Sequence, residues 1–164
     1  METASIGRAR KLARKLLKDS GCRSTPIILR DIISYLKNES GLECGSLELS
    51  DAVSGFLIED EDVTAIGYND GHHVHRQRFS VAHEIGHFML SHNTQRKDDI
   101  NKTDADPIHE TEANAFAAEL LMPLELLKKD LKGSINIPDI AKKYWVSEEA
   151  MARRFQDPAV LKYV

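Results

Sequence analysis

One stretch near the middle of the chain combines apolar residues with three ionisable ones at helical spacing. Its apolar residues are Phe79, Val81, Ala82, Ile85, Phe88, Met89 and Leu90. Between them stand His83, Glu84 and His87. A helix that is apolar on most sides is usually buried, and buried polar groups without partners cost free energy. The fold must therefore bring partners to these three side chains, and a bound metal ion would satisfy all of them.

The spacing of the two histidines fits a single ion. Residues four apart lie on one face of an α-helix, so His83 and His87 can reach the same metal. The segment has the H-E-x-x-H pattern that is typical of a zinc-dependent peptidase helix, in which Glu84 is predicted to hold the water and act as the catalytic base. Two solvated histidines on a surface helix are the alternative for the five letters alone. Gly86 is predicted to let another element approach this helix closely.

A catalytic zinc usually takes three protein ligands and keeps one position open for water. The candidates for the third ligand are His92, His109, Glu110, Glu112 and Glu119. On a helix predicted from about residue 108 to 122, Glu110 and Asn114 share a face. One of them can bind the metal while the other hydrogen-bonds a ligand histidine. We therefore prefer Glu110, with Glu112 second, and otherwise expect Glu112 and Glu119 to be solvated carboxylates.

Length and composition narrow the class of protein. The 164 residues suit one domain with its own core, and 41% hydrophobic and 29% charged residues are ordinary for a soluble globular protein. No apolar run approaches the roughly 18 residues that span a bilayer, and the N-terminus does not have the pattern of a signal peptide. We predict a cytoplasmic protein in which Cys22 and Cys44 are free thiols. The net charge of −4 argues against a general nucleic-acid binder.

The predicted fold class is α+β, mainly helical with a small three-stranded antiparallel sheet. Gly21 and Gly41 are expected to end the first two helices. The predicted strands cover residues 42–49, 53–59 and 63–68. The predicted helices cover about 5–19, a segment after 25–26, 75–92, 108–122, a short segment after 123, and two segments within 137–156. A polar stretch, residues 93–107, is expected to be a mobile surface loop.

The tail has the pattern of a helix, a short turn and a second helix over residues 140–155, similar to a helix-turn-helix. Ser147 is the predicted N-cap of the second helix. Two glutamates follow it, where a recognition helix would meet bases and where they would repel phosphate. We expect the pair to close the fold. A docking surface for a protein partner is an alternative, as is DNA binding, which charge reversal at Arg153 and Arg154 would test.

Two further groups of side chains have open roles. His72, His73 and His75 form a cluster that precedes the active helix. We expect a turn of solvated histidines there rather than a second metal site, because no carboxylate or thiolate stands at clear ligand spacing. The donor that would stabilise an oxyanion is not defined by the sequence, and His109 and Tyr68 are the candidates.

Two blocks of sequence resemble the ImmA/IrrE family of metallopeptidases. They are residues 78–87, RFSVAHEIGH, and residues 112–123, EANAFAAELLMP. The resemblance extends over most of the chain and implies a minimal zincin-like fold, with a small sheet, an active helix and a glutamate on a following helix. The family pattern places the third ligand four residues before the asparagine. It thus implies the ligand set His83, His87 and Glu110.

The resemblance also implies an organisation and a function. Residues 1–164 would form a single metallopeptidase domain, with an N-terminal helix within 1–24 and a helix-turn-helix-like tail over 134–164. Known members are cytoplasmic and cut a partner transcriptional repressor, which switches on stress-response or mobile-element genes. The expected protein is a zinc-dependent endopeptidase whose substrate is a repressor of helix-turn-helix type. It would bind no membrane, and direct nucleic-acid binding is not expected.

Several alternatives stay open. Zinc fits the predicted nitrogen and oxygen ligands, and manganese or iron could also load. In place of a peptidase, the chain could be a non-proteolytic metal-binding module that captures a partner, as in a toxin–antitoxin pair or a repressor complex. It could also be a DNA-binding regulator that uses the C-terminal helices. The sequence does not define the oligomeric state or the bond that is cut.

Overall fold

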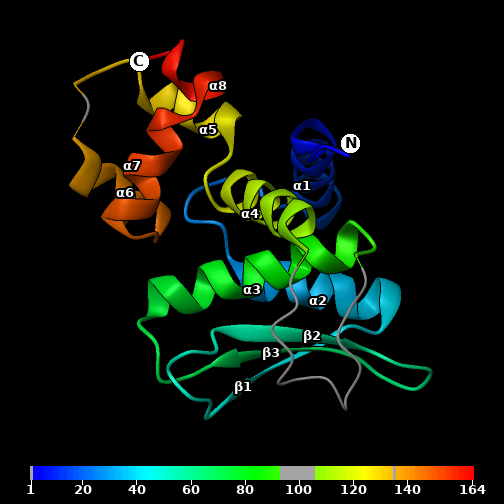
Figure 1. The fold of residues 1–164 in the computed structure, drawn as a ribbon. Coiled ribbons are helices and arrows are strands. Elements are labelled where there is room, and N and C mark those ends of the chain that lie inside the picture. Colours follow the sequence, from blue (N-terminus) through cyan, green and yellow to red (C-terminus); the bar gives the residue numbers. More distant parts are fainter. Residues whose placement is uncertain (1, 93–105, 135) are drawn as a thin grey trace.

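The computed structural model of the chain describes residues 2–92, 106–134 and 136–164, which form mainly helices and one small sheet (Figure 1). The helices are α1 (Ile6–Ser20), α2 (Leu29–Ser40), α3 (Val74–Met89), α4 (Pro107–Leu121), α5 (Leu124–Asp130), α6 (Ile137–Tyr144), α7 (Glu148–Gln156) and α8 (Pro158–Leu161). The strands are β1 (Glu43–Leu47), β2 (Gly55–Glu59) and β3 (Thr64–Asn69). The predicted α+β class is confirmed. Among the described helices, none is long and apolar enough to cross a membrane.

The sheet has the strand order β1-β3-β2, with β3 parallel to β1 and antiparallel to β2. The prediction of an antiparallel sheet was therefore wrong for the β1–β3 pair. The connection from β1 to β2 crosses the end of β3 instead of forming a hairpin, so β3 lies between the other two strands. Asn69, at that end of β3, is buried and donates from Nδ2 to the carbonyl oxygens of Ser50 and Val53, at 3.0 and 2.9 Å. These bonds hold the crossing connection in place.

The elements stack in layers, and α3 occupies a central one. It packs on β2 and β3 with one side and on α4 with the other, and α1 packs on α4 in turn (Figure 1). The apolar core runs through these layers and includes Leu57, Ile66, Ile85, Phe116 and Leu120. Helices α5 to α8 gather at one end of α4. Because α1 and α3 both pack on α4, that helix is covered on two sides.

The ends of the helices follow the local sequence. Gly21 and Gly41 adopt left-handed conformations, with φ of 76° and 74°, and end α1 and α2 as predicted. Asp106 and Ser147 cap α4 and α7 by accepting a backbone N–H of the first turn, at 2.9 and 3.0 Å. The Ser147 cap is confirmed. Helix α8 was not predicted, and the loop expected over residues 93–107 lies almost wholly outside the described residues.

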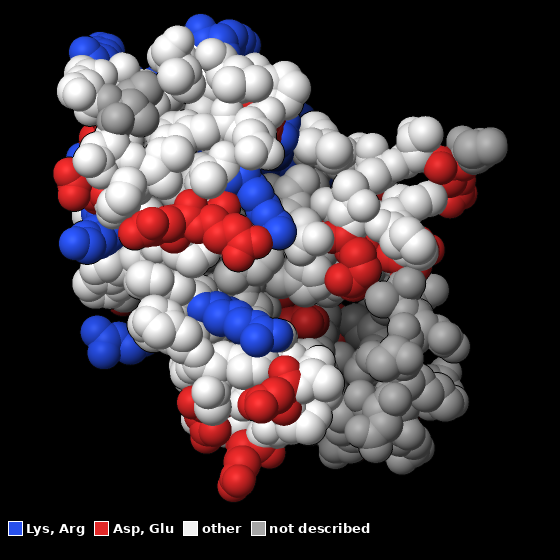
Figure 2. Space-filling view, turned by 60° about the vertical axis from the view of Figure 1, so that its left-hand side comes forward, with Lys and Arg blue, Asp and Glu red and all other residues white. Residues whose placement is uncertain are grey.

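The surface on the side of α6 and α7 is mixed in charge. Figure 2 turns this side forward and shows acidic and basic side chains next to one another around a hollow. A face that binds nucleic acid would instead present a patch of one sign to the phosphates. The face seen in Figure 2 carries charges of both signs.

Candidate metal centre

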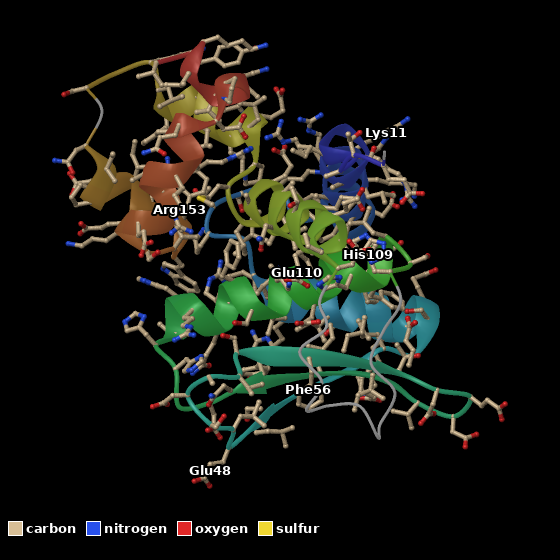
Figure 3. All side chains as sticks on the ribbon, viewed as in Figure 1. Lys11, Glu48, Phe56, His109, Glu110 and Arg153 are labelled. Carbon is tan, nitrogen blue, oxygen red and sulfur yellow. The ribbon has the colours of Figure 1, made fainter. Side chains whose placement is uncertain are left out.

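Three side chains from two helices converge beside the sheet. His83 and His87 lie one turn apart on α3, and Glu110, which is labelled in Figure 3, lies in the first turn of α4. The two Nε2 atoms are 3.0 Å apart. The carboxylate of Glu110 places one oxygen 3.0 Å from Nε2 of His83 and the other 2.9 Å from Nε2 of His87. The three residues predicted as ligands are thus brought together, although they come from segments more than 20 residues apart.

The donor set fits a divalent transition metal. Two imidazole nitrogens and one carboxylate oxygen are ligands that zinc takes in catalytic sites. A tetrahedral ion with bonds of about 2.0–2.1 Å holds its donors about 3.3 Å apart, a few tenths of an ångström more than these contacts. Among the described residues, this is the grouping of histidine, cysteine and carboxylate side chains that could hold an ion. His83, His87 and Glu110 could therefore hold a metal with little rearrangement.

The other nitrogen of each imidazole also has a partner. Nδ1 of His83 lies 2.8 Å from Oδ1 of Asn114, and Nδ1 of His87 lies 2.8 Å from Nδ1 of His92. An acceptor at Nδ1 keeps the proton there and leaves the lone pair of Nε2 free for a metal. The spacing argument predicted such a bond from Asn114. It did not predict the one from His92.

His92 and Glu112 lie behind His87 and are not part of the donor cluster. Nε2 of His92 is 2.7 Å from one oxygen of Glu112, and the other oxygen accepts the backbone N–H of Ser5 at 2.7 Å. Both side chains are buried, at 4% and 9% exposed. The expectation that Glu112 is a solvated carboxylate was therefore wrong, because α1 and α3 cover this part of α4. The Ser5 N–H is the main cause that lowers the pKa of Glu112.

The ionisable groups of the site shift one another's pKa values. Hydrogen bonds with His83 and then with His87 hold the pKa of Glu110 well below its ordinary value. Burial lowers the pKa of His83, but the Glu110 hydrogen bond and the charges of Glu84 and Glu110 outweigh it, so the net shift is upward. Burial raises the pKa of Glu84. A carboxylate with a raised pKa is a better proton acceptor, which suits a general base.

Glu84 faces a cavity next to the donor cluster. The cavity has a volume of about 390 Å³ and is lined by Ser54, Gly55, Arg76, Phe79, Ser80, His83, Glu84 and Glu110. A Cβ at Gly55 would lie 2.9 Å from the carbonyl oxygen of Gly67 on β3 and 3.7 Å from Cγ of Glu84, so the close pairing of β2 with β3 requires a glycine beside this side chain. The two residues considered as oxyanion donors, His109 and Tyr68, do not line the cavity. Arg76 does, and its guanidinium donates to Oγ of Ser54 at 3.2 Å.

Gly86 allows the close contact between α3 and α4 that the sequence suggested. A Cβ at this position would lie 3.1 Å from Cδ1 of Phe116 and 3.2 Å from backbone atoms of Ala113. These distances are tighter than ordinary packing contacts. Gly86 stands between the two histidines on α3, so the absence of a side chain here sets how near Glu110 comes to them.

The histidines before α3 have structural contacts of their own. Nδ1 of His73 caps α3 by accepting the backbone N–H of His75 at 3.1 Å. Nε2 of His72 lies 3.1 Å from the carbonyl oxygen of Asp51. His73 is exposed, whereas His72 and His75 are only partly so. Within the described residues, none of the three takes part in a grouping that could hold an ion.

A second, larger cavity adjoins the first. It has a volume of about 640 Å³ and lies between α3, α4 and α7. Its walls combine apolar side chains such as Met122 and Val146 with charged ones such as Glu149 and Arg153. Arg76 and Phe79 line both cavities, so the two spaces meet at these side chains. Figure 2 shows this side of the molecule hollowed between its charged groups.

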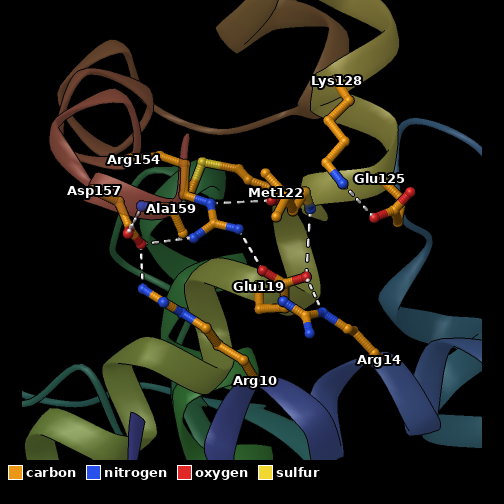
Figure 4. A network of polar contacts seen from close by, with 10 residues as sticks. Arg10, Arg14, Glu119, Met122, Glu125, Lys128, Arg154, Asp157 and Ala159 are labelled. Atoms are coloured by element: carbon orange, nitrogen blue, oxygen red, sulfur yellow. Dashed lines mark hydrogen bonds and ion pairs between the residues drawn. The ribbon is translucent and has the colours of Figure 1, made fainter. Parts of the chain in front are cut away.

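Buried ion pairs attach the tail to the rest of the structure (Figure 4). Arg154 of α7 pairs with Glu119 of α4 and with Asp157, and it donates to the carbonyl oxygen of Met122 at 3.1 Å. The other oxygen of Glu119 accepts from Nε of Arg14 at 2.9 Å. The expectation that Glu119 is solvated was therefore wrong. Because Arg154 is buried and paired, charge reversal there would disturb the fold and would not report on DNA binding.

The chain is similar to proteins already described. Residues 47–156 match the family model of Peptidase_M78, the IrrE N-terminal-like domain. No curated protein matches the chain. A solved structure of a "Mycobacterium tuberculosis transcriptional regulator" has the same fold, with a TM-score of 0.68 and 13% identity. The match covers 92% of this chain and 46% of the mycobacterial one, so the chain spans about half the length of that protein. The family match covers more than half of the 164 residues and contains all three possible metal ligands, and on that ground the chain belongs to the Peptidase_M78 family.

Proposed function

We propose that the chain is a zinc-dependent endopeptidase with His83, His87 and Glu110 as its metal ligands and Glu84 as its general base. The observation that carries the proposal is the convergence of three donors at 2.9–3.0 Å, with Glu84 in the adjoining cavity. Membership of a peptidase family supports the same class of reaction.

The residues around the cavity have separate tasks in this reaction. A zinc ion would act as a Lewis acid and lower the pKa of a water molecule towards 7. Glu84 takes a proton from that water and returns it to the leaving amine. Its partly buried position raises its pKa and so strengthens it as a proton acceptor. Arg76 is the arginine that lines this cavity, and we assign it the stabilisation of the oxyanion in place of His109 or Tyr68.

The shape of the site supports a polypeptide substrate. Strand β2 lies at the edge of the sheet, and Gly55 at its start lines the catalytic cavity. An extended peptide can add to a sheet edge through backbone hydrogen bonds, with its side chains in neighbouring pockets. The larger cavity continues past Phe79 and offers room for such side chains. We infer that the substrate chain runs past Glu84 between the edge of β2 and the larger cavity.

We propose that the substrate is a transcriptional repressor of helix-turn-helix type, whose cleavage releases stress-response or mobile-element genes. The sequence resemblance to repressor-cutting peptidases motivates this step. The mycobacterial protein with the same fold is named as a transcriptional regulator, which agrees with a regulatory role. A cytoplasmic location and the absence of a membrane partner are part of the same proposal.

The test uses the purified chain and the repressor encoded next to its gene. The zinc-loaded protein is incubated with the repressor, and fragments are identified by mass spectrometry. Cleavage at a defined bond that is lost with a chelator and with Glu84→Gln supports the proposal. Loss of cleavage must coincide with retained zinc binding in Glu84→Gln, because this substitution leaves the donor cluster intact.

A binding module without proteolysis gives the opposite result. In that case no fragments form and Glu84→Gln leaves derepression in cells unchanged. Either result overturns the peptidase proposal. A DNA-binding role would appear as salt-dependent binding of the promoter, and it is tested at exposed Arg153 alone, since Arg154 is buried in an ion pair.

A further inference from the structure

We propose that His92 and Glu112 are positioning residues for His87, linked in a relay that ends at the backbone N–H of Ser5. The relay runs from His87 to His92 to Glu112 through contacts of 2.8 and 2.7 Å, and from Glu112 to Ser5 through one of 2.7 Å. The inference rests on the metal site and is independent of which substrate, if any, is cut.

The proton positions in the relay follow from its geometry. His87 points Nε2 at the donor cluster, so its proton must be on Nδ1 if a metal is to bind. Nδ1 of His92 is then the acceptor of that proton and carries none itself. A neutral His92 must hold its proton on Nε2, where it donates to Glu112. The carboxylate of Glu112 accepts at both oxygens, so every group in the relay has one consistent role.

The relay differs from the support given to the other histidine. His83 donates to Asn114, a neutral amide on the exposed side of α4. His87 is supported by a buried imidazole and behind it a buried carboxylate. A carboxylate at the end of such a relay makes the ligand nitrogen more basic, and an outer partner of this kind contributes about 10- to 100-fold to metal affinity in other sites. His92 and Glu112 are therefore expected to matter for how tightly the metal is held.

The relay also connects two distant parts of the chain. Ser5 is the residue from which α1 begins, and its N–H bonds Glu112 on α4 across 107 positions of sequence. The start of α1 thereby becomes part of the support for a ligand on α3. His109 stacks on the His92 ring, with centroids 4.0 Å apart and planes 11° apart, and fixes the plane of that ring.

The first test measures zinc affinity by competition with a chromophoric chelator. His92→Phe retains a ring that can stack on His109 but removes both hydrogen bonds, and Glu112→Gln retains the shape but loses the charge and one acceptor. Each is expected to weaken zinc binding by about 10- to 100-fold. His109→Phe is the matched control, because it retains the stack and takes no part in the relay. Its affinity should stay within about twofold of the parent.

A backbone test separates the relay from side-chain packing. Ser5→Pro removes the N–H that Glu112 accepts, whereas Ser5→Ala retains it. Ser5 has a φ of −92°, beyond the usual range of proline, so the two variants are compared once circular dichroism shows that both are folded. Zinc affinity should fall in Ser5→Pro and remain at the parent value in Ser5→Ala. Equal affinities in the two variants would remove Ser5 from the relay.

A spectroscopic test reads the relay directly. Nitrogen-15 NMR of the imidazoles should show the proton on Nδ1 in His83 and His87 and on Nε2 in His92. Finding the proton of His92 on Nδ1 would overturn the proposal, as would parent-like zinc affinity in folded Glu112→Gln. If His92→Phe does not fold, as judged by circular dichroism, Glu112→Gln and the tautomers decide. A chain that passes these tests but cuts no repressor contradicts only the proposed function.

Discussion

Arg154 and Glu119 form an ion pair in which neither side chain is more than 2% exposed. Removal of one partner leaves the other with a single remaining ion pair, to Asp157 for Arg154 or to Arg14 for Glu119. Breaking a buried pair in this way costs up to about 3–5 kcal/mol. We predict that Glu119→Leu and Arg154→Leu each lower the free energy of unfolding by this amount. Urea denaturation followed by circular dichroism measures it.

Arg153 provides the control for this prediction. It neighbours Arg154 in sequence, and its own pair with Glu149 is about three-quarters exposed. Exposed pairs contribute about 0–1 kcal/mol, so Arg153→Leu should change stability by less than about 1 kcal/mol. Equal losses at the two positions would show that the ion pair of Arg154 does not anchor the tail.

Gly86 supplies a second prediction, on helix spacing. An alanine here would place its Cβ against Ala113 and Phe116. We expect Gly86→Ala to destabilise the protein by about 1–3 kcal/mol, as overpacking does, and to weaken zinc binding because α4 carries Glu110. Gly7 in α1 has no atom within 4 Å of such a Cβ. Gly7→Ala should leave stability unchanged or raise it, and unaltered melting of Gly86→Ala would contradict the close packing.

Metal removal should lower thermal stability. A ligand at 100 times its dissociation constant stabilises the folded state by about 2.7 kcal/mol. For a chain of this length that is about 5–10 °C in Tm. We expect this difference between zinc-loaded and chelator-treated protein by differential scanning fluorimetry. Glu110→Gln should abolish the difference and Glu148→Gln, on the tail, should retain it. A zinc-dependent shift that survives Glu110→Gln would place the ion elsewhere.

Arg76 is predicted to act on the rate rather than on the metal. Loss of one oxyanion donor costs about 100- to 1,000-fold in kcat in well-studied hydrolases. We expect Arg76→Gln to lower kcat for repressor cleavage by about this factor, with zinc affinity unchanged, because Arg76 lines the cavity and is not in the donor cluster. If KM rises while kcat stays the same, Arg76 binds substrate and does not stabilise the oxyanion.

The thiol of Cys44 should be slow to react. Burial raises its pKa to about 11, and only the thiolate is nucleophilic. Since a raised pKa keeps the thiol protonated at neutral pH, alkylation by iodoacetamide should be slow at pH 7 and should accelerate about tenfold per pH unit up to about pH 11. Mass spectrometry of the peptide that contains Cys44 follows the reaction. Fast alkylation in the folded protein at pH 7 would show that the thiol is accessible.

Periodicity predicted most of the elements because it depends on neighbouring residues. The helix that carries His83 and His87, the cap at Ser147 and the left-handed ends at Gly21 and Gly41 all follow from residues within one turn of each other. The direction of a strand does not follow from neighbouring residues. The parallel β1–β3 pair depends on a connection held by Asn69, whose partners lie 16 to 20 positions away.

The site shows the same division. The donor cluster of His83, His87 and Glu110 was predictable, since the two histidines are local and Glu110 shares a helical face with Asn114. The buried roles of Glu112 and Glu119 were not, because each carboxylate has a partner more than 100 positions away, in the segment that starts and forms α1. The sequence around a carboxylate does not distinguish a solvated side chain from a buried one. Glu112 and Glu119 are buried because α1 packs on α4.

Helix α4 carries three carboxylates, and each contacts side chains of other elements. Glu110 contacts the histidines of α3, Glu112 contacts His92 and Glu119 contacts Arg154. Because α1 and α3 enclose it, this segment has little surface on which a change could pass unnoticed. A random-mutagenesis screen for inactive variants should therefore recover hits from α4 out of proportion to its fifteen residues. Many of those substitutions would inactivate the protein by impairing its folding and not by removing a group that takes part in the reaction.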